Sequence, residues 1–288
     1  TTTIVTCVLG KMFKKLSKLV KSDKRDICRS YHFEVDATEH PEESFRVLSD
    51  AETELADKLK NQTGTTNPLN MEDFEFISPI PEERYNEVIV HLRNNFFADE
   101  PLNKSLGLCQ PGEPHAELEA HSLNTLHDQL SVMAVDKETD QVVAVSLNGI
   151  QFPGDIKREK EKLAKMTDEK FKQIFTLLNN LNETLELFMK YDVDKIFDAR
   201  ILSVDSNYRG KGLGKEIMRR AEEVATENNF QMMKGDATGA FSQKILLSLG
   251  WKLIHELKYV DHLDENGEQI FKPPPPHQSL KIMIKMLN

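Results

Sequence analysis

A glycine-rich loop joins an apolar run to an amphipathic run in the second half of the chain, and its position limits the folds that the sequence can adopt. The loop, Asp205-Ser-Asn-Tyr-Arg-Gly-Lys-Gly-Leu-Gly214, follows a strand-like run over 197–204 and opens a helix-like run over 212–228. Glycines let the backbone turn tightly and point successive N–H groups outward, and the following helix adds the positive end of its dipole. This arrangement predicts an anion-binding site where a strand ends and a helix begins.

The spacing within the loop excludes two well-known phosphate-binding motifs. A Walker A loop would need glycine at the position of Arg209, ahead of Gly214 and Lys215. A dinucleotide-binding loop that starts at Gly210 would need glycine where Leu213 or Lys215 stands. The remaining pattern is Arg-x-x-Gly-x-Gly, for which a simple helix-capping turn is the alternative interpretation.

Strand-like and helix-like runs alternate from Met71 to the end of the chain. Apolar alternation and β-branched residues predict strands, and apolar residues spaced by three and four predict helices. The Asn266-Gly267 pair predicts a hairpin, and the proline run at 273–276 delays its returning strand until after His277. The expected fold class is α/β with a mixed sheet, in one domain of about 215 residues. The predicted strands cover 74–78, 131–135, 141–147, 197–204 and 230–234, with 251–263 and 269–286 in the hairpin, and the predicted helices cover 81–97, 115–128, 212–228 and 240–249, with a long helical insertion at about 157–190.

The first 70 residues differ in composition from the rest of the chain. Residues 1–30 carry eight Lys/Arg against two Asp/Glu, whereas residues 31–70 carry three against nine. The polar run at 61–68 contains Gly and Pro and predicts a linker, so we place a domain boundary at about residue 70. Residues 12–21 form a short basic amphipathic stripe. A poorly ordered extension is the favoured interpretation, and a mitochondrial or membrane-surface targeting segment is the alternative.

Composition and charge exclude several functional classes. The chain has 288 residues, a net charge of -10 and a mean hydropathy of -0.48, and it has no apolar run long enough to span a membrane. The acidic balance argues against a general nucleic-acid binder, which needs a surplus of cations, and suits a cationic small substrate. Three cysteines without disulfide or zinc spacing indicate a reducing compartment. We therefore expect a cytoplasmic protein, monomeric and without a metal.

Three separated stretches accompany the loop. Phe96-Phe-Ala-Asp-Glu-Pro-Leu-Asn103 follows the first helix, Ile201-Leu-Ser-Val-Asp205 precedes the loop, and Phe271-Lys-Pro273 with Pro276-His277 lies near the C-terminal end. Together with the loop they resemble the insect arylalkylamine N-acetyltransferases of the GNAT superfamily, and within these the dopamine N-acetyltransferase type. The resemblance covers about residues 72–287, including the helical insertion, and leaves out residues 1–70.

The resemblance implies the GNAT fold, in which a mostly antiparallel central sheet flanked by helices splays apart where acetyl-CoA binds. The pantetheine amides of acetyl-CoA would bond to the exposed strand edge at Leu202, Ser203 and Val204, and the pyrophosphate would lie on N–H groups of the loop. The implied reaction is direct acetyl transfer to the primary amine of an arylalkylamine such as dopamine, tyramine, octopamine or serotonin, in a ternary complex. The loop residues implied to bind acetyl-CoA are Arg209, Gly210, Lys211, Gly212, Leu213, Gly214 and Lys215.

Four side chains match positions to which the family assigns catalytic roles. Glu100, in the Asp-Glu-Pro-Leu stretch, matches the general base that removes a proton from the protonated amine. Ser242 and Thr238 match two serines, and Ser242 is the candidate acid for the departing CoA thiolate because Phe241 stands where a tyrosine is frequent. His277 matches a histidine that would join a water chain to Glu100. The alternatives are a solvated acid at a helix end, a capping serine and a structural histidine.

Phe96, Phe97 and Pro101 are predicted to line the amine-binding cleft beside Glu100. Aromatic rings suit an aromatic amine and its cation, although most phenylalanines belong to a core. Two other functions remain open. One is acetylation of polyamines or protein lysines by the same fold, and the other is a non-catalytic acyl-CoA-binding module.

Overall fold

The computed structural model describes residues 69–287 of the chain. The predicted basic segment at 12–21 and the predicted linker at 61–68 lie outside the described residues. The N-terminal extension over 1–70 and the domain boundary near residue 70 therefore stay predictions.

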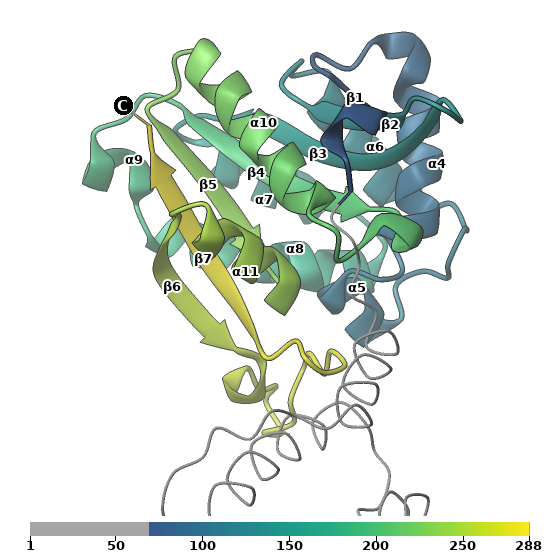
Figure 1. The fold of residues 1–288 in the computed structure, drawn as a ribbon. Coiled ribbons are helices and arrows are strands. Elements are labelled where there is room, and N and C mark those ends of the chain that lie inside the picture. The colour runs from purple at the N-terminus through teal and green to yellow at the C-terminus, as the bar shows by residue number, and fades with distance from the viewer. Residues whose placement is uncertain (1–68, 288) are drawn as a thin grey trace, which may run out of the picture. The chain divides into compact units, whose positions relative to one another are not determined.

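A seven-stranded sheet runs through the described part of the chain in the order β1-β2-β3-β4-β5-β7-β6 (Figure 1). Neighbouring strands are antiparallel except for β4 and β5, which are parallel. The mixed, mostly antiparallel sheet is thereby confirmed. The strands are β1 (Phe74–Ile77), β2 (Val132–Asp136), β3 (Gln141–Gln151), β4 (Ile196–Val204), β5 (Met232–Ala237), β6 (Lys252–Lys258) and β7 (Ser279–Met286).

Helices cover both faces of this sheet. One face, forward in Figure 1, carries α10 (Leu213–Glu227) and α11 (Ala240–Ser248). The opposite face carries α4 (Tyr85–Asn95), α6 (Ala116–Leu126), α7 (Asp155–Leu163) and α8 (Glu169–Thr184). The remaining elements are α5 (Pro101–Leu106), α9 (Leu187–Tyr191) and four single 3-10 turns at Met71–Asp73, Glu82–Arg84, Ser206–Tyr208 and Tyr259–Asp261.

Cover on both faces explains why β2 is a continuous apolar run. Val132 and Ala134 pack with α10 on one face, and Met133 and Val135 pack with α4 and α6 on the other. Side chains alternate between the two faces of a strand, so a strand that is covered on both sides has no polar face.

The insertion predicted at about 157–190 is helical, but it consists of three helices. α7 ends at Leu163, and α8 begins after Asp168, whose side chain accepts a hydrogen bond from the N–H of Phe171. α8 ends at Thr184, and Glu186 has a positive φ before α9 begins. A capping aspartate and a left-handed residue interrupt the backbone ladder, and apolar spacing alone does not reveal such breaks.

The C-terminal hairpin differs in detail from its prediction. β6 and β7 pair antiparallel, and β7 begins after His277 as expected. Near the Asn266-Gly267 turn, pairing is reduced to an isolated bridge between Leu263 and Gln269. The turn therefore closes a small local loop, and the long strand pairing lies further from it.

β4 and β5 pair over a short stretch and then separate. Beyond Ala199, β4 continues to Val204 with no strand on its β5 side within the described residues, while its other edge stays paired with β3. The fold thus leaves a free strand edge that leads directly to the glycine-rich loop. The paired residues of β4 and β5 are Phe197 with Met233, Asp198 with Lys234, and Ala199 with Gly235.

Candidate active site

The glycine-rich loop leads from the end of β4 into the first turn of α10. Gly210 and Gly212 adopt φ angles of 76° and 99°, which residues with a side chain rarely adopt. A Cβ on Gly214 would lie 3.3 Å from Cγ2 of Val204 and 3.2 Å from Cδ1 of Ile245, so glycine lets helix and strand approach closely. The loop thereby presents the start of a 15-residue helix, whose first N–H groups have no acceptor within the helix.

Arg209 fastens this loop to the end of α4. Its Nη1 lies 2.9 Å from Oδ2 of Asp99, its Nη2 donates to the carbonyl oxygen of Asn95 at 2.6 Å, and its Nε donates to that of Val204 at 2.8 Å. Asp99 directly precedes Glu100, so this arginine ties the loop to the segment that carries the predicted base. The predicted contact of the Arg209 backbone with pyrophosphate stays a prediction.

The free edge of β4 offers backbone groups rather than side chains. Ser203 is 3% exposed, and its Oγ lies 3.0 Å from Nε2 of His91 in the interior. Leu202 and Val204 are half-buried. Because backbone N–H and C=O groups lie in the plane of a sheet, this edge can still bond to the amides of a ligand. The predicted contact with pantetheine is untested.

Glu100 caps the N-terminus of α5. Its Oε2 accepts a hydrogen bond from the N–H of Asn103 at 2.7 Å, and Pro101 occupies the first helical position. Its Oε1 is shielded from solvent and has no hydrogen-bond partner among residues 69–287. The Glu100 carboxyl is therefore not a solvated acid at a helix end. Its Oε1 is still able to accept a hydrogen bond.

Burial raises the pKa of the Glu100 carboxyl above its ordinary value. The Thr238 hydroxyl and the N–H groups of Asn103 and Leu102 act in the opposite direction and do not outweigh burial. The Thr238 hydroxyl lies near the carboxyl and lowers its pKa, but it makes no hydrogen bond of standard geometry to Oε1. A raised pKa suits a base that must take a proton from an ammonium group near neutral pH.

Thr238 lies just beyond the end of β5 and is supported by a tyrosine that the sequence pattern did not bring out. The hydroxyl of Tyr259 donates to the carbonyl oxygen of Thr238 at 2.6 Å, and Tyr259 is 1% exposed. Burial and the nearby Glu100 carboxyl raise the pKa of Tyr259 far above its ordinary value. This phenol stays protonated and positions Thr238.

His277 and Ser242 both contact the start of α11. Nδ1 of His277 accepts a hydrogen bond from the N–H of Ala240 at 3.1 Å, and burial lowers the pKa of this ring. A Cβ on Gly239 would lie 3.1 Å from the same nitrogen and 3.2 Å from Cγ of Pro101, so His277 is close to the segment that carries the predicted base. The hydroxyl of Ser242 donates to the carbonyl oxygen of Gly239 at 2.9 Å. Both side chains have structural partners, and their catalytic roles stay predictions.

A cavity of about 150 Å³ adjoins Glu100 and Thr238. Phe96 lines it, and its predicted contact with the amine stays a prediction. Phe97 is 0% exposed in the core beside α4, and Pro101 is buried at the start of α5; neither lines the cavity. Their predicted substrate contacts have no support from this geometry. The apolar wall consists of Phe96, Leu102, Leu118, Ile156, Ile174, Phe175, Leu178, Ala199 and Ile201.

Another part of the cavity wall is a charged cluster that was not predicted. Lys234 is 3% exposed, and its Nζ lies 3.1 Å from Oδ1 of Asp198 and 3.3 Å from Oδ2 of Asp236. Nε of Arg200 lies 3.2 Å from the other oxygen of Asp198. The available signal was the alternation of charged residues in two otherwise apolar strands, which directs them to one face of the sheet.

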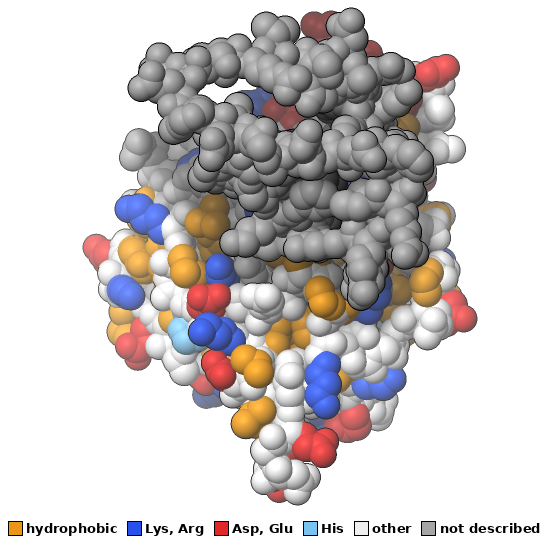
Figure 2. Space-filling model, turned by 60° about the horizontal axis from the view of Figure 1, so that its bottom comes forward, with side chains coloured by type: hydrophobic (Ala, Val, Ile, Leu, Met, Phe, Trp, Pro, Cys, Tyr) orange, Lys and Arg blue, Asp and Glu red, His pale blue; other side chains and the backbone are white. Residues whose placement is uncertain are grey.

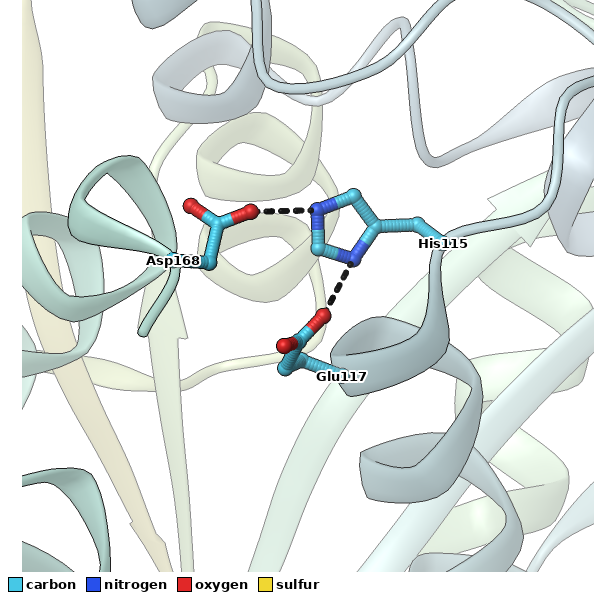
Figure 3. Close-up of side chains that lie close together, drawn as sticks. All are labelled: His115, Glu117 and Asp168. Carbon is cyan, nitrogen blue, oxygen red and sulfur yellow. Dashed lines mark ion pairs between the residues drawn. The ribbon is translucent and has the colours of Figure 1, made fainter. Parts of the chain in front are cut away.

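His115 lies between two carboxylates in a group whose composition resembles a metal site (Figure 3). Its Nδ1 is 3.5 Å from Oε2 of Glu117, and its Nε2 is 3.3 Å from Oδ2 of Asp168. The two acids face different ring nitrogens, whereas a metal ion would take one nitrogen together with both acids. The geometry suits a histidine that joins α6 to the start of α8. The expected absence of a metal stays a prediction.

The splayed β4–β5 pair, the glycine-rich loop at the start of α10 and the buried carboxylate beside them define an acetyltransferase of the GNAT class. Residues 184–240 match a family model described as the acetyltransferase (GNAT) family. The chain is 51% identical to arylalkylamine N-acetyltransferase 2 from Aedes aegypti, in a match that covers 75% of this chain and 100% of that chain with a TM-score of 0.73. The chain belongs to the arylalkylamine N-acetyltransferase family, which confirms the resemblance seen in the sequence.

Two further solved structures share the fold at lower identity. A mosquito arylalkylamine N-acetyltransferase like 5b is 27% identical, with 74% of this chain and 100% of that chain covered and a TM-score of 0.67. A Drosophila melanogaster polyamine N-acetyltransferase that forms N-acetylagmatine is 25% identical, with 75% and 100% covered and a TM-score of 0.66. Within residues 69–287, no helix combines the length and the apolar character needed to cross a membrane.

Proposed function

We propose that this chain transfers the acetyl group of acetyl-CoA to the primary amine of arylalkylamines such as dopamine, tyramine, octopamine and serotonin. The observation that carries the proposal is Glu100, a buried carboxyl with a raised pKa and an unpaired oxygen on the wall of an interior cavity. The 51% identity to a mosquito arylalkylamine N-acetyltransferase supports the same class of substrate.

In the proposed reaction, Glu100 accepts a proton from the substrate ammonium group, directly or through one water. The freed nitrogen attacks the thioester carbonyl carbon, the C–S bond breaks, and the CoA thiolate leaves with the bonding electrons. Ser242 is the proposed proton donor to this thiolate, and the second proton lost by the nitrogen restores it. The products are an N-acetylamine, CoA and one released proton, with no acetyl-enzyme.

The segments proposed to bind acetyl-CoA are connected in the fold to the segment that carries the proposed base. Backbone groups of residues 202–204 would hold the pantetheine, and N–H groups of residues 209–214 would hold the pyrophosphate at the positive end of α10. Arg209 connects that loop to Asp99, which precedes Glu100. This contact therefore links the loop proposed to bind acetyl-CoA to the segment that carries the proposed base.

The cavity wall favours an aromatic amine over an extended peptide. Phe96 and Phe175 line the cavity together with aliphatic side chains such as Leu102. Aromatic walls suit a ring with a nearby cation. Polyamines are the second candidate class, because the cavity also has acidic residues and the chain is 25% identical to a polyamine N-acetyltransferase.

The test is CoA-thiol release by the full chain with acetyl-CoA and a panel of dopamine, serotonin, tyramine, spermidine and a lysine peptide. We expect kcat/KM to be highest for the three aromatic amines. A preference for spermidine would replace the aromatic assignment with the polyamine one. If none of the five amines gives thiol release while acetyl-CoA still binds, the result would indicate a non-catalytic acyl-CoA-binding module.

A further inference from the structure

The charged cluster on the cavity wall has one unfilled hydrogen-bonding position. Lys234 has three N–H donors, and they face Asp198, Asp236 and Oδ1 of Asn182 at 3.1 to 3.3 Å. Asn182 uses both amide hydrogens, one on Oδ2 of Asp236 at 2.7 Å and one on the carbonyl oxygen of Leu178 at 2.9 Å. Oδ1 of Asp236 is buried and has no hydrogen-bond partner among the described residues.

A buried acceptor without a partner calls for a donor from outside the protein. Buried polar atoms are nearly always hydrogen-bonded, and an unfilled one marks a place for water or a ligand. Asp236 lines the same cavity as Glu100 and Thr238, so the missing donor would come from a molecule in that cavity. Since Lys234 and Asn182 have spent their donors, a ligand that offered only acceptors would gain nothing from either of them.

The charge balance of the cluster distinguishes a neutral donor from a second cation. Asp198 and Asp236 carry two negative charges, and Lys234 and Arg200 carry two positive charges within a few ångströms of them. Two more carboxyl groups line the cavity, those of Asp155 and Glu159. Asp155 is paired with Arg158, and burial raises the pKa of Glu159, which favours its neutral form. The two buried carboxylates are therefore already balanced by two buried cations. A distal ammonium or guanidinium group would find no net negative charge there to offset its own desolvation, whereas a neutral hydroxyl needs none.

Asp236, near the end of β5, and Thr238, just beyond it, mark two neighbouring places on the cavity wall. Asp236 and Thr238 are two residues apart, so in an extended chain their side chains share one face and lie about 6–7 Å apart along it. Thr238 adjoins Glu100, the proposed base. Because Asp236 and Thr238 line the same cavity, a substrate with its amine at Glu100 can direct its ring along β5 toward Asp236.

We propose that Asp236 is a specificity-determining residue that accepts a hydrogen bond from a ring hydroxyl of the amine substrate. The preferred substrates are then phenylethylamines and related amines with a hydroxyl on the ring. This inference rests on the proposed function and narrows its substrate class. Burial raises the pKa of Asp236 despite the opposing effect of Lys234 and Asn182 on its other oxygen, which agrees with an Oδ1 that lacks a donor.

The test compares tyramine with phenylethylamine, which differ by one ring hydroxyl, in the full-length protein. We expect the wild type to favour tyramine by roughly tenfold or more in kcat/KM, because a site built to bond a hydroxyl discriminates against the analogue that lacks it. Asp236→Ala should bring this ratio close to one. Asp236→Asn keeps a carbonyl oxygen and should retain part of the preference.

The ratio of kcat/KM for tyramine to kcat/KM for phenylethylamine distinguishes a loss of hydroxyl recognition from damage to the structure. A variant that loses catalytic geometry or folded protein lowers both kcat/KM values together and leaves their ratio unchanged. Asp194→Asn is the matched control, because Asp194 is exposed and does not line the cavity. It should keep the wild-type ratio.

Three results would overturn the inference. They are a wild-type ratio near one, a ratio unchanged in Asp236→Ala, and a preference for spermidine that Asp236→Ala alone abolishes. The first requires no variant, so failure of Asp236→Ala to fold does not prevent a decision. Absence of turnover with every arylalkylamine would instead count against the proposed function.

Discussion

Nζ of Lys234 lies 3.1 Å from Oδ1 of Asp198, and these two residues are register partners on β5 and β4 one step before the strands separate. The parallel ladder therefore ends in an ion pair. Basic, acidic and apolar side chains are interspersed on the described part of the face shown in Figure 2, whereas the pair of Lys234 and Asp198 belongs to the wall of the cavity. The position of the pair makes it a support for the opening at which acetyl-CoA is proposed to bind.

Replacing Lys234 with methionine should destabilise the protein strongly. The change leaves the buried carboxylates of Asp198 and Asp236 without their shared cation. Breaking a buried pair by removing one partner typically costs about 3–5 kcal/mol, and we expect a loss of about 3 kcal/mol or more in the free energy of unfolding. Chemical denaturation measures this directly. Lys244→Met, at an exposed site, should stay within about 0.5 kcal/mol of wild type; equal effects of the two changes would show that the buried pair contributes little.

Glu100→Gln should separate activity from stability. The amide keeps the oxygen that caps Asn103 but cannot accept a proton from the substrate, so we expect kcat to fall by about 100-fold or more. At neutral pH the variant should unfold at a higher temperature than wild type, because it no longer buries a charge with an unpaired oxygen. Thiol release and thermal unfolding are the two measurements. Glu113→Gln, at an exposed site, is the matched control and should change neither.

The pH dependence of both properties follows from the raised pKa of Glu100. A group whose pKa is higher in the folded state favours folding below its unfolded-state pKa, and this contribution is lost as pH rises through the folded-state value. The stability advantage of Glu100→Gln should therefore shrink as pH falls through the folded-state pKa, and it should disappear below about pH 4, where the wild-type carboxyl becomes protonated in both states. In activity, kcat/KM should rise with pH through a value above the ordinary pKa of glutamic acid. A rising limb at or below that ordinary value would contradict the assignment of Glu100 as the base.

The sequence predicted the parts of this site that have a local signature. The glycine spacing indicated the loop before α10, and the Asp-Glu-Pro-Leu stretch indicated Glu100 at a chain segment fixed by proline. The charged cluster was missed because Asp198 and Lys234 are far apart in the sequence and meet only through strand pairing. Phe96 and Phe97 show another limit of the sequence pattern: of these two adjacent phenylalanines after α4, one lies in the core and one lines the cavity, and composition does not say which.

Gly212→Ala should weaken acetyl-CoA binding more than amine binding. Gly212 has a φ of 99° as the residue that starts α10, and an L side chain in a left-handed conformation costs roughly 1–2 kcal/mol. Relief of that strain would turn the N–H groups of the loop, so we expect the KM for acetyl-CoA to rise several-fold while the KM for tyramine changes little. Gly250→Ala is a matched control, because Gly250 has a φ of 82° and nothing within 4 Å of an added Cβ, and it ends α11 instead of starting α10. Both variants should lose similar stability in thermal unfolding, and only Gly212→Ala should change the KM for acetyl-CoA. A rise in that KM for Gly250→Ala as well would mean that general destabilisation, and not the geometry of the loop, accounts for the effect.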